Sequence, residues 1–127
     1  MIENEKQLFQ LLKKRLIPDL ESTDMYNPKD AVSQRYGAAF EFKCRKKHYD
    51  YLILEKFKYD KLIQYNRARY IVSTPYGVYS FDLKKIKPVW IDAMLPATTE
   101  FENSNWIQKK VADLNIEEAK NISFIQY

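Results

Sequence analysis

The sequence contains one cysteine, Cys44, and one histidine, His48. A single cysteine excludes an internal disulfide, and together with a single histidine it excludes a zinc site built from several such ligands. A metal ion would therefore be held mainly by carboxylates. Oxygen ligands of this kind suit magnesium or manganese, and calcium can use them too, whereas zinc prefers nitrogen and sulfur.

Glycine is also scarce, with only Gly37 and Gly77 in the chain. This scarcity excludes the glycine-rich loop with which nucleotide triphosphatases cradle phosphates. A serine hydrolase would depend on His48 alone, beside no recognisable nucleophile motif. No apolar run approaches the roughly 20 residues that a membrane span needs. We therefore expect a cytoplasmic protein with no membrane partner.

The length of 127 residues predicts one domain, residues 1–127, with a substantial core but without room for a second domain. The chain has 21 lysines and arginines against 17 aspartates and glutamates, a formal net charge of +4, and its pI is near 9.0. This balance is compatible with a polyanionic partner, but an excess of this size is ordinary in proteins. Charge alone does not identify the partner.

Residues 36–45 read as a strand that carries an acid and a base where a strand is usually apolar. Side chains alternate between the two faces of a strand, so Phe40 and Phe42 take one face while Glu41 and Lys43 take the other. Burying a carboxylate and an ammonium is costly unless they are paired or bound to a metal, so the pattern favours a chemical role. The alternative is an edge strand with a solvated face.

Residues 30–33 predict a second strand, which turns back through residues 34–37 into residues 38–45. Such a hairpin brings Asp30, at the far end of its strand, close to Glu41 and Lys43 on the neighbouring one. Asp24 is the competing acid. It lies in the polar residues 19–30, where we expect one short strand with its loops.

The first helix is predicted over residues 3–16 because apolar residues recur there at helical spacing, at Leu8, Phe9, Leu12 and Leu16. Glu5 lies in line with this apolar stripe at the start of the helix, where its carboxylate could serve a site. The alternative is that Glu5, like Glu3, only interacts favourably with the helix dipole.

A second helix is predicted over residues 54–66, where four residues share a face: Glu55, Lys58, Tyr59 and Leu62. Lys58 either extends to water from the boundary of the core or contacts a phosphate or a catalytic residue. Residues 69–73 and 78–83 predict two further strands joined by a turn. The lysines that follow, Lys84, Lys85 and Lys87, could flank a phosphate track.

The last third of the chain predicts an apolar segment over residues 90–95 that covers the core. A final helix is expected after it, with Asn103 or Ser104 as its cap. Its buried stripe would be Ile107, Val111 and Leu114. The predicted fold class is therefore α/β, with a mixed central sheet flanked by helices.

This order of a helix with an acid, a hairpin with Asp30 and an acid-x-Lys triplet, a second helix and further strands resembles the PD-(D/E)XK nuclease superfamily. That superfamily has the restriction-endonuclease-like fold and includes archaeal Holliday-junction resolvases. Small phage-type endonucleases look most similar. The resemblance covers residues 5 to about 83 and uses the runs Asp30-Ala31-Val32-Ser33, Glu41-Phe42-Lys43-Cys44-Arg45, Tyr49-Asp50 and Glu55-Lys56-Phe57-Lys58-Tyr59-Asp60. It departs at Lys29, because the proline of the motif stands one step earlier, at Pro28.

The resemblance implies a metal-dependent DNA endonuclease that hydrolyses phosphodiester bonds. Asp30 and Glu41, with the main-chain carbonyl of Phe42, would hold magnesium, for which manganese would substitute. Lys43 would position or deprotonate the attacking water, or stabilise the pentavalent phosphate as a cation. Glu5 resembles the first-helix acid of many members. The implied catalytic residues are therefore Asp30, Glu41, Lys43 and Glu5.

The implied partner is DNA, either duplex or branched. The side chains expected to bind its phosphates are Arg45, Lys46 and Lys47, directly after the triplet, and Lys58. We expect a homodimer, because a nuclease with one site must act twice to cut both strands. If a phage encodes the protein, it would act in the cytoplasm of the host cell.

Two alternatives remain from the sequence. The first is a catalytically silent member of the same fold that holds nucleic acid through its basic residues, and metal binding would separate it from an enzyme. The second is a small protein-interaction domain, for which the ten tyrosines and two tryptophans would supply an aromatic surface.

Overall fold

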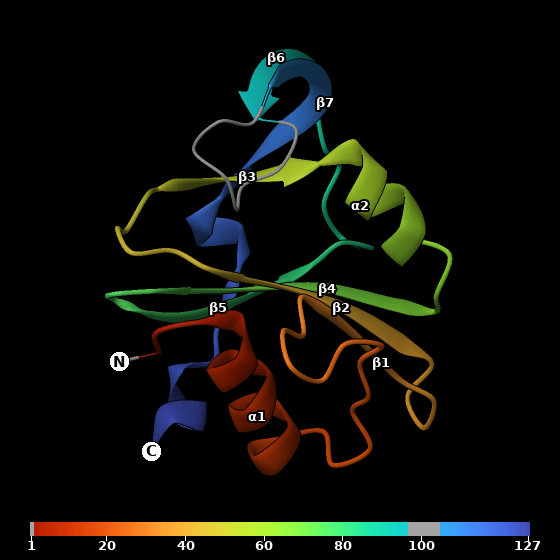
Figure 1. The fold of residues 1–127 in the computed structure, drawn as a ribbon, viewed down its shortest axis with the longest axis vertical. Helices are drawn as coiled ribbons and strands as arrows, with labels where there is room; N and C mark the ends of the chain where they lie inside the picture. The colour runs from red at the N-terminus through yellow and green to blue at the C-terminus, as the bar shows by residue number, and fades with distance from the viewer. Residues whose placement is uncertain (1, 97–104) are drawn as a thin grey trace.

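The computed structural model describes residues 2–96 and 105–127. Within them, a mixed five-stranded sheet has the order β1-β2-β4-β5-β8, and an antiparallel three-stranded sheet has the order β3-β7-β6. In Figure 1 the larger sheet crosses the middle, with α1 below it and with α2 and the smaller sheet above. In chain order the elements are α1 (Glu5–Arg15), β1 (Asp30–Ser33), β2 (Ala38–Cys44), β3 (Tyr51–Glu55), α2 (Lys56–Leu62), β4 (Arg67–Thr74), β5 (Gly77–Asp82), β6 (Ile91–Pro96), β7 (Trp106–Asn115), η1 (Ile116–Glu118), β8 (Lys120–Asn121) and η2 (Ser123–Gln126).

The predicted hairpin is confirmed. β1 pairs with β2 in antiparallel register, and Gly37 turns the chain between them with a φ of 58°, a backbone region that favours glycine. β2 then pairs with β4 in parallel, so the intervening chain, with β3 and α2, crosses from one end of the sheet to the other. The β4–β5 hairpin extends the sheet as predicted.

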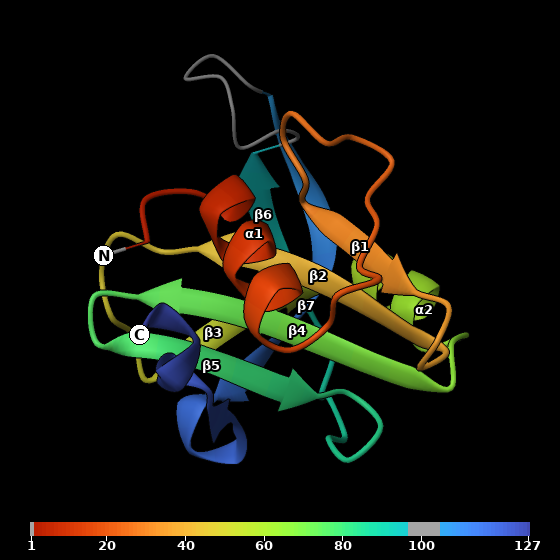
Figure 2. The same ribbon diagram turned by 90° about the horizontal axis from the view of Figure 1, so that it is seen from below.

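The two faces of β2 bury different kinds of side chain. Phe40 and Phe42 face α1, where the rings of Phe9 and Phe42 meet edge to face at 6.0 Å. Figure 2, seen from below, shows α1 lying across β2 and β4. The opposite face packs against α2 and the smaller sheet through a second core of buried apolar residues that includes Leu52, Leu54, Leu62, Val72 and Phe81. Glu41 and Lys43 belong to this second face, as the alternation predicts.

The last predicted helix is wrong, because residues 106–115 form the strand β7, paired with β3 on one side and β6 on the other. The spacing of Ile107, Val111 and Leu114 mimics a helical stripe, but Ile107 is 43% exposed in the structure. The caps proposed for that helix, Asn103 and Ser104, lie outside the described residues.

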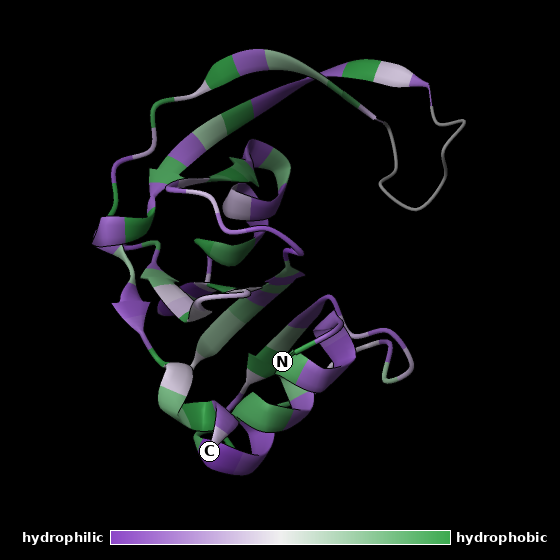
Figure 3. Ribbon diagram, turned by 90° about the vertical axis from the view of Figure 1, so that its left-hand side faces the viewer, coloured by the Kyte–Doolittle hydropathy of each residue, from purple (hydrophilic) through white to green (hydrophobic). Residues whose placement is uncertain are grey.

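The prediction that residues 90–95 cover the core holds only for Trp90, which packs against the second core. The residues that follow it belong to β6, in which Ile91 and Met94 are half exposed. β6 and β7 together form the curved arm at the top of Figure 3, along which hydrophilic and hydrophobic residues alternate. This arm extends over the face of the larger sheet that carries Glu41 and Lys43.

The first helix is confirmed as α1, which begins after Asn4, whose side chain accepts a hydrogen bond of 2.9 Å from the Gln7 amide. The second is shorter than predicted, since α2 covers Lys56–Leu62 and the preceding residues form β3. In the polar residues 19–30, the short strand expected there is reduced to one isolated bridge between Glu21 and Val32.

Candidate active site

Asp30 and Glu41 lie directly opposite each other in the β1–β2 pair. Side chains at such positions project from the same face with their Cβ atoms about 5 Å apart. Both line a cavity of about 380 Å³ whose other lining residues include Lys58 and Lys61. The amide of Phe42 donates a hydrogen bond of 2.8 Å to the carbonyl of Lys29, so the main chain of Phe42 faces the β1 side of the strand. The hairpin thus places two carboxylates and this main-chain segment close together near the β1 edge of the larger sheet.

The competing acid, Asp24, has a different role in the structure. Its side chain is exposed, and its carboxylate accepts hydrogen bonds from the amides of Tyr26 (3.0 Å) and Asn27 (3.1 Å), which fold the local turn. The described residues that line the cavity beside Glu41 include Asp30 and not Asp24. The structure therefore pairs Glu41 with Asp30.

Glu41 is a buried acid, with 7% of its surface exposed. Burial raises the pKa of its carboxyl from 4.5 to about 7, Lys58 opposes this, and the neighbouring charge of Asp30 adds to it. Because burial disfavours the ionised form of this carboxyl, a nearby cation would stabilise that form. The electrostatics of Glu41 therefore favour binding a positive charge at this edge.

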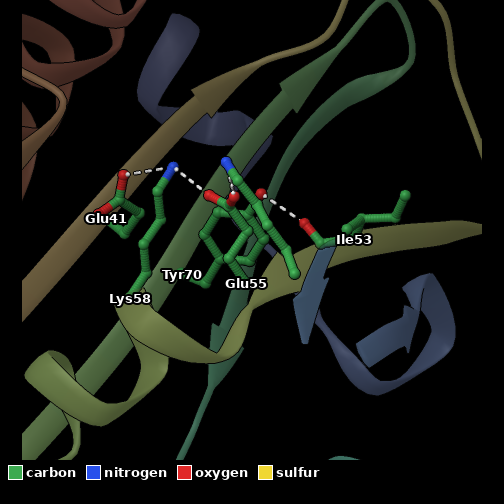
Figure 4. Close-up of polar contacts among 6 residues, drawn as sticks. Glu41, Ile53, Glu55, Lys58 and Tyr70 are labelled. Carbon is green, nitrogen blue, oxygen red and sulfur yellow. Dashed lines mark hydrogen bonds and ion pairs between the residues drawn. The ribbon is translucent and has the colours of Figure 1, made fainter. Parts of the chain in front are cut away.

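Lys58 of α2 supplies such a charge. Its Nζ lies 3.6 Å from Oε2 of Glu41 and 3.4 Å from Oε2 of Glu55, so one ammonium bridges two carboxylates. Figure 4 shows Lys58 between these two acids. The side chain of Lys58 is still 35% exposed, so the expected extension to water and a contact with Glu41, a predicted catalytic residue, occur together.

Glu55, the residue just before α2, connects this cluster to the β6–β7 arm. Its Oε1 lies 2.5 Å from Nζ of Lys109 on β7. Burial alone would raise the pKa of Glu55, but Lys109 and Lys58 together hold it below its usual value. Sequence reasoning missed Lys109, because its position depends on the pairing of β7 with β3, in which Glu55 stands opposite Val111. No local pattern encodes that long-range pairing.

Lys43 of β2 and Arg45, which directly follows the strand, line a second cavity, of about 220 Å³. Burial lowers the pKa of the Lys43 ammonium, the charges of Arg45 and Lys58 lower it further, and Glu5 acts in the opposite direction. Tyr70 of β4 also lines this cavity and donates a hydrogen bond of 3.2 Å to the carbonyl of Ile53. Burial raises the pKa of the Tyr70 hydroxyl, which therefore stays neutral.

Glu5 stands apart from this cluster. It begins α1, which packs on the opposite face of β2, and it is half-buried. The described residues that line the two cavities do not include it. Its charge still acts on Lys43, so Glu5 is placed to influence the predicted catalytic lysine from the other side of the sheet.

The predicted phosphate-binding residues divide into two groups. Arg45 is half-buried in the second cavity, and its amide donates a hydrogen bond of 2.8 Å to the carbonyl of Ser73. Lys46 and Lys47 are exposed in the loop that follows β2. His48 lies farther along this loop, within 2.9 Å of the Thr74 hydroxyl, with its ring stacked on Tyr76 at 4.3 Å. The single histidine therefore belongs to a separate packing cluster.

The donor set fits a hard divalent cation through two carboxylates and a main-chain oxygen. In the part of the chain that the structure describes, no three histidine, cysteine, aspartate or glutamate side chains are grouped to hold a metal. The fit thus depends on the Asp30 and Glu41 pair with a carbonyl such as that of Phe42, which is the ligand set that the resemblance implies. The ammonium of Lys58 beside Glu41 shows that this edge accommodates a positive charge.

Comparison with known proteins does not add to this description. No family model matches the chain, no curated protein matches it, and no solved structure matches it. Within the described residues, no helix is long and apolar enough to cross a membrane. The geometry and electrostatics around Glu41 therefore carry the functional interpretation.

Proposed function

We propose that this chain is a metal-dependent DNA endonuclease of phage or mobile-element type, with a restriction-endonuclease-like core. One observation carries the proposal: Asp30 stands directly opposite Glu41, and Lys43 follows two residues later on the same face of β2. This placement is what the hydrolysis of a phosphodiester by two carboxylates and a lysine requires. The proposed place of action is the cytoplasm of the host cell.

The topology supports this proposal. The chain runs from α1 through the β1–β2 hairpin and then through α2 to β4, which is parallel to β2. The bridge between Glu21 and Val32 adds a short extended segment beside β1. This order of helix, hairpin, crossover helix and parallel strand resembles the core of the PD-(D/E)XK superfamily. The acid-x-Lys triplet lies on β2, which is the middle strand of β1, β2 and β4.

Asp30, Glu41 and the carbonyl of Phe42 would hold magnesium or manganese. When bound, such a cation offsets the negative charge on the scissile phosphate and lowers the pKa of an attacking water. The chain contributes the rest of the site. α2 positions Lys58 beside the carboxylate of Glu41, which is buried.

Lys43 has two roles open to it. As a neutral amine it could take a proton from water, and the lowered pKa of its side chain favours that form. As an ammonium it could stabilise the negative charge that develops on the phosphate. Lys43→Arg separates the two, because arginine keeps the charge and cannot act as a base near neutral pH. Retained cleavage would indicate the electrostatic role, and lost cleavage with retained metal binding would indicate the base.

The catalytically silent alternative is favoured by one observation. The ammonium of Lys58 lies on Glu41 and Glu55, and it could take the place of the metal permanently. In that case the chain would bind DNA through its basic residues without a divalent cation. Metal binding at Asp30 and Glu41 discriminates the two functions.

The test is cleavage of plasmid and branched DNA with magnesium and with a chelator. We expect cleavage with magnesium only, and its loss in Glu41→Ala with the fold intact. Asp24→Asn is the matched control, because Asp24 is an acid of the same region that only folds a turn. Equal activity with magnesium and with chelator, or equal loss in Asp24→Asn and Asp30→Asn, would contradict the proposal.

A further inference from the structure

The two cavities beside Lys58 differ in charge. The first is lined by the two carboxylates of Asp30 and Glu41 and by two ammonium groups, of Lys58 and Lys61, whereas the second is lined by four cations, Lys43, Arg45, Lys58 and Lys109, and by one carboxylate, that of Glu55. Among the described residues, only Lys58 lines both cavities. A site for a cation therefore adjoins a site with an excess of positive charge.

The four cations of the second cavity are half-buried. Lys109 is 21% exposed at its side chain, and apolar atoms of Ile53, Leu54, Leu95 and Pro96 complete the walls. The cavity thus gathers four cationic side chains around the single carboxylate of Glu55. Such a group of cations gains free energy from a bound anion.

The β6–β7 arm closes this cavity over the sheet. Leu95 and Pro96 of β6 and Lys109 of β7 come from the arm, while Lys43 lies on β2, Arg45 directly follows β2, and Tyr70 lies on β4. A volume of about 220 Å³ has room for a phosphate group with a few waters. The arm and the sheet thus enclose a space whose size and charge suit a phosphate.

We propose that this second cavity binds a phosphate group through Arg45 and Lys109, beside the place where the reacting phosphate would lie. Insofar as that phosphate belongs to DNA, the inference rests on the proposed function. Glu55 competes with it, because the carboxylate holds Lys109 at 2.5 Å and Lys58 at 3.4 Å. A phosphate entering the cavity therefore displaces Glu55 from one or both lysines.

This competition gives an experiment with a matched control. Glu55→Gln frees Lys109 in the cavity, and Asp92→Asn frees Lys110, which pairs with Asp92 at 3.1 Å on the exposed side of the arm. Both substitutions add one positive charge. Binding of a short labelled DNA duplex is measured by anisotropy in chelator at several salt concentrations. We expect Glu55→Gln to bind more tightly than Asp92→Asn, with a salt slope steeper by roughly 0.9 for one added phosphate contact. Equal effects of the two variants would overturn the proposal.

A second pair of variants tests the proposal if Glu55→Gln does not fold. Lys109→Gln is compared with Lys110→Gln in the same assay, and circular dichroism checks the fold. Weaker binding and a shallower salt slope are expected only for Lys109→Gln. If both variants weaken binding equally, general surface charge explains it and the cavity is not a phosphate site.

Competitors identify the source of the phosphate. If inorganic phosphate or a deoxynucleoside monophosphate displaces the duplex more readily from Glu55→Gln than from Asp92→Asn, the cavity takes free or terminal phosphate. If only a DNA chain shows the difference between the variants, it takes an internal phosphate of the backbone. Because chelator prevents cleavage, this assay is independent of the proposed nuclease activity. If the protein cleaves DNA with metal but Glu55→Gln and Asp92→Asn bind DNA equally, the phosphate site is refuted and the proposed nuclease activity is not.

Discussion

Replacing Glu41 with glutamine should stabilise the metal-free protein at neutral pH. Folding raises the pKa of Glu41 from 4.5 to about 7, chiefly through burial, so the folded state favours the protonated acid. Stability is therefore lost as pH rises from the unfolded value toward the folded one. The difference between 4.5 and about 7, which already includes the opposing effect of Lys58, corresponds to about 3 kcal/mol.

Urea denaturation in chelator at about pH 5 and about pH 8 tests this. Glu41→Gln should resemble the natural protein at the lower pH and be more stable at the higher one. Glu55→Gln is the control of opposite sign, because Lys109 and Lys58 lower the pKa of Glu55, whose ionised form therefore stabilises the fold above its unfolded pKa. Glu55→Gln should be less stable than the natural protein at about pH 8. A stability difference for Glu41→Gln that does not change with pH would refute the assignment of Glu41 as a desolvated acid.

Three further outcomes are expected. Lys43→Ala should reduce cleavage by a factor on the order of 100 or more with little loss of DNA affinity, and equal losses of both would contradict a role in the reaction itself. Lys46→Ala with Lys47→Ala should weaken binding of all sequences and lower the salt slope by roughly 0.9 for each lost phosphate contact, and an unchanged slope would show that these exposed lysines contact no phosphate. Light scattering should give a homodimer, and a mass near 15.2 kDa with and without DNA would exclude it.

The elements around the acid pair were predictable because their signals are local. α1 has a helical stripe and a capping Asn4, and the β1–β2 hairpin has a turn at Gly37 between two short strands. The alternation of Phe40, Glu41 and Phe42 separates the two faces of β2 correctly. In such segments the neighbours in sequence determine both the conformation and the buried side.

The smaller sheet was not predictable in the same way. In β3 the exposed positions are occupied by Tyr51 and Ile53, so apolar residues occur on both faces and the alternation with buried Leu52 and Leu54 is hidden. β7 pairs with β3 across a long stretch of chain. The strand pairing decides its conformation and overrides the helical spacing of its apolar residues.

The same difference limits the prediction of the site. Asp30, Glu41 and Lys43 come from one hairpin, so their proximity follows from local structure. Lys58 could be noticed from its place on the face of α2, but its contact with Glu41 depends on how α2 packs on the sheet. Lys109 needed the arm to be known first.

The most direct test of the central claim is manganese soaked into crystals of the natural protein and of Asp30→Asn. We predict an anomalous difference peak between the carboxylates of Asp30 and Glu41, with Nζ of Lys58 moved away from the 3.6 Å contact with Glu41. In Asp30→Asn the peak should be absent or much weaker. If the natural protein shows no peak and Lys58 remains on Glu41, the acid pair does not hold a divalent cation, and the chain is a catalytically silent binding domain instead of a metal-dependent nuclease.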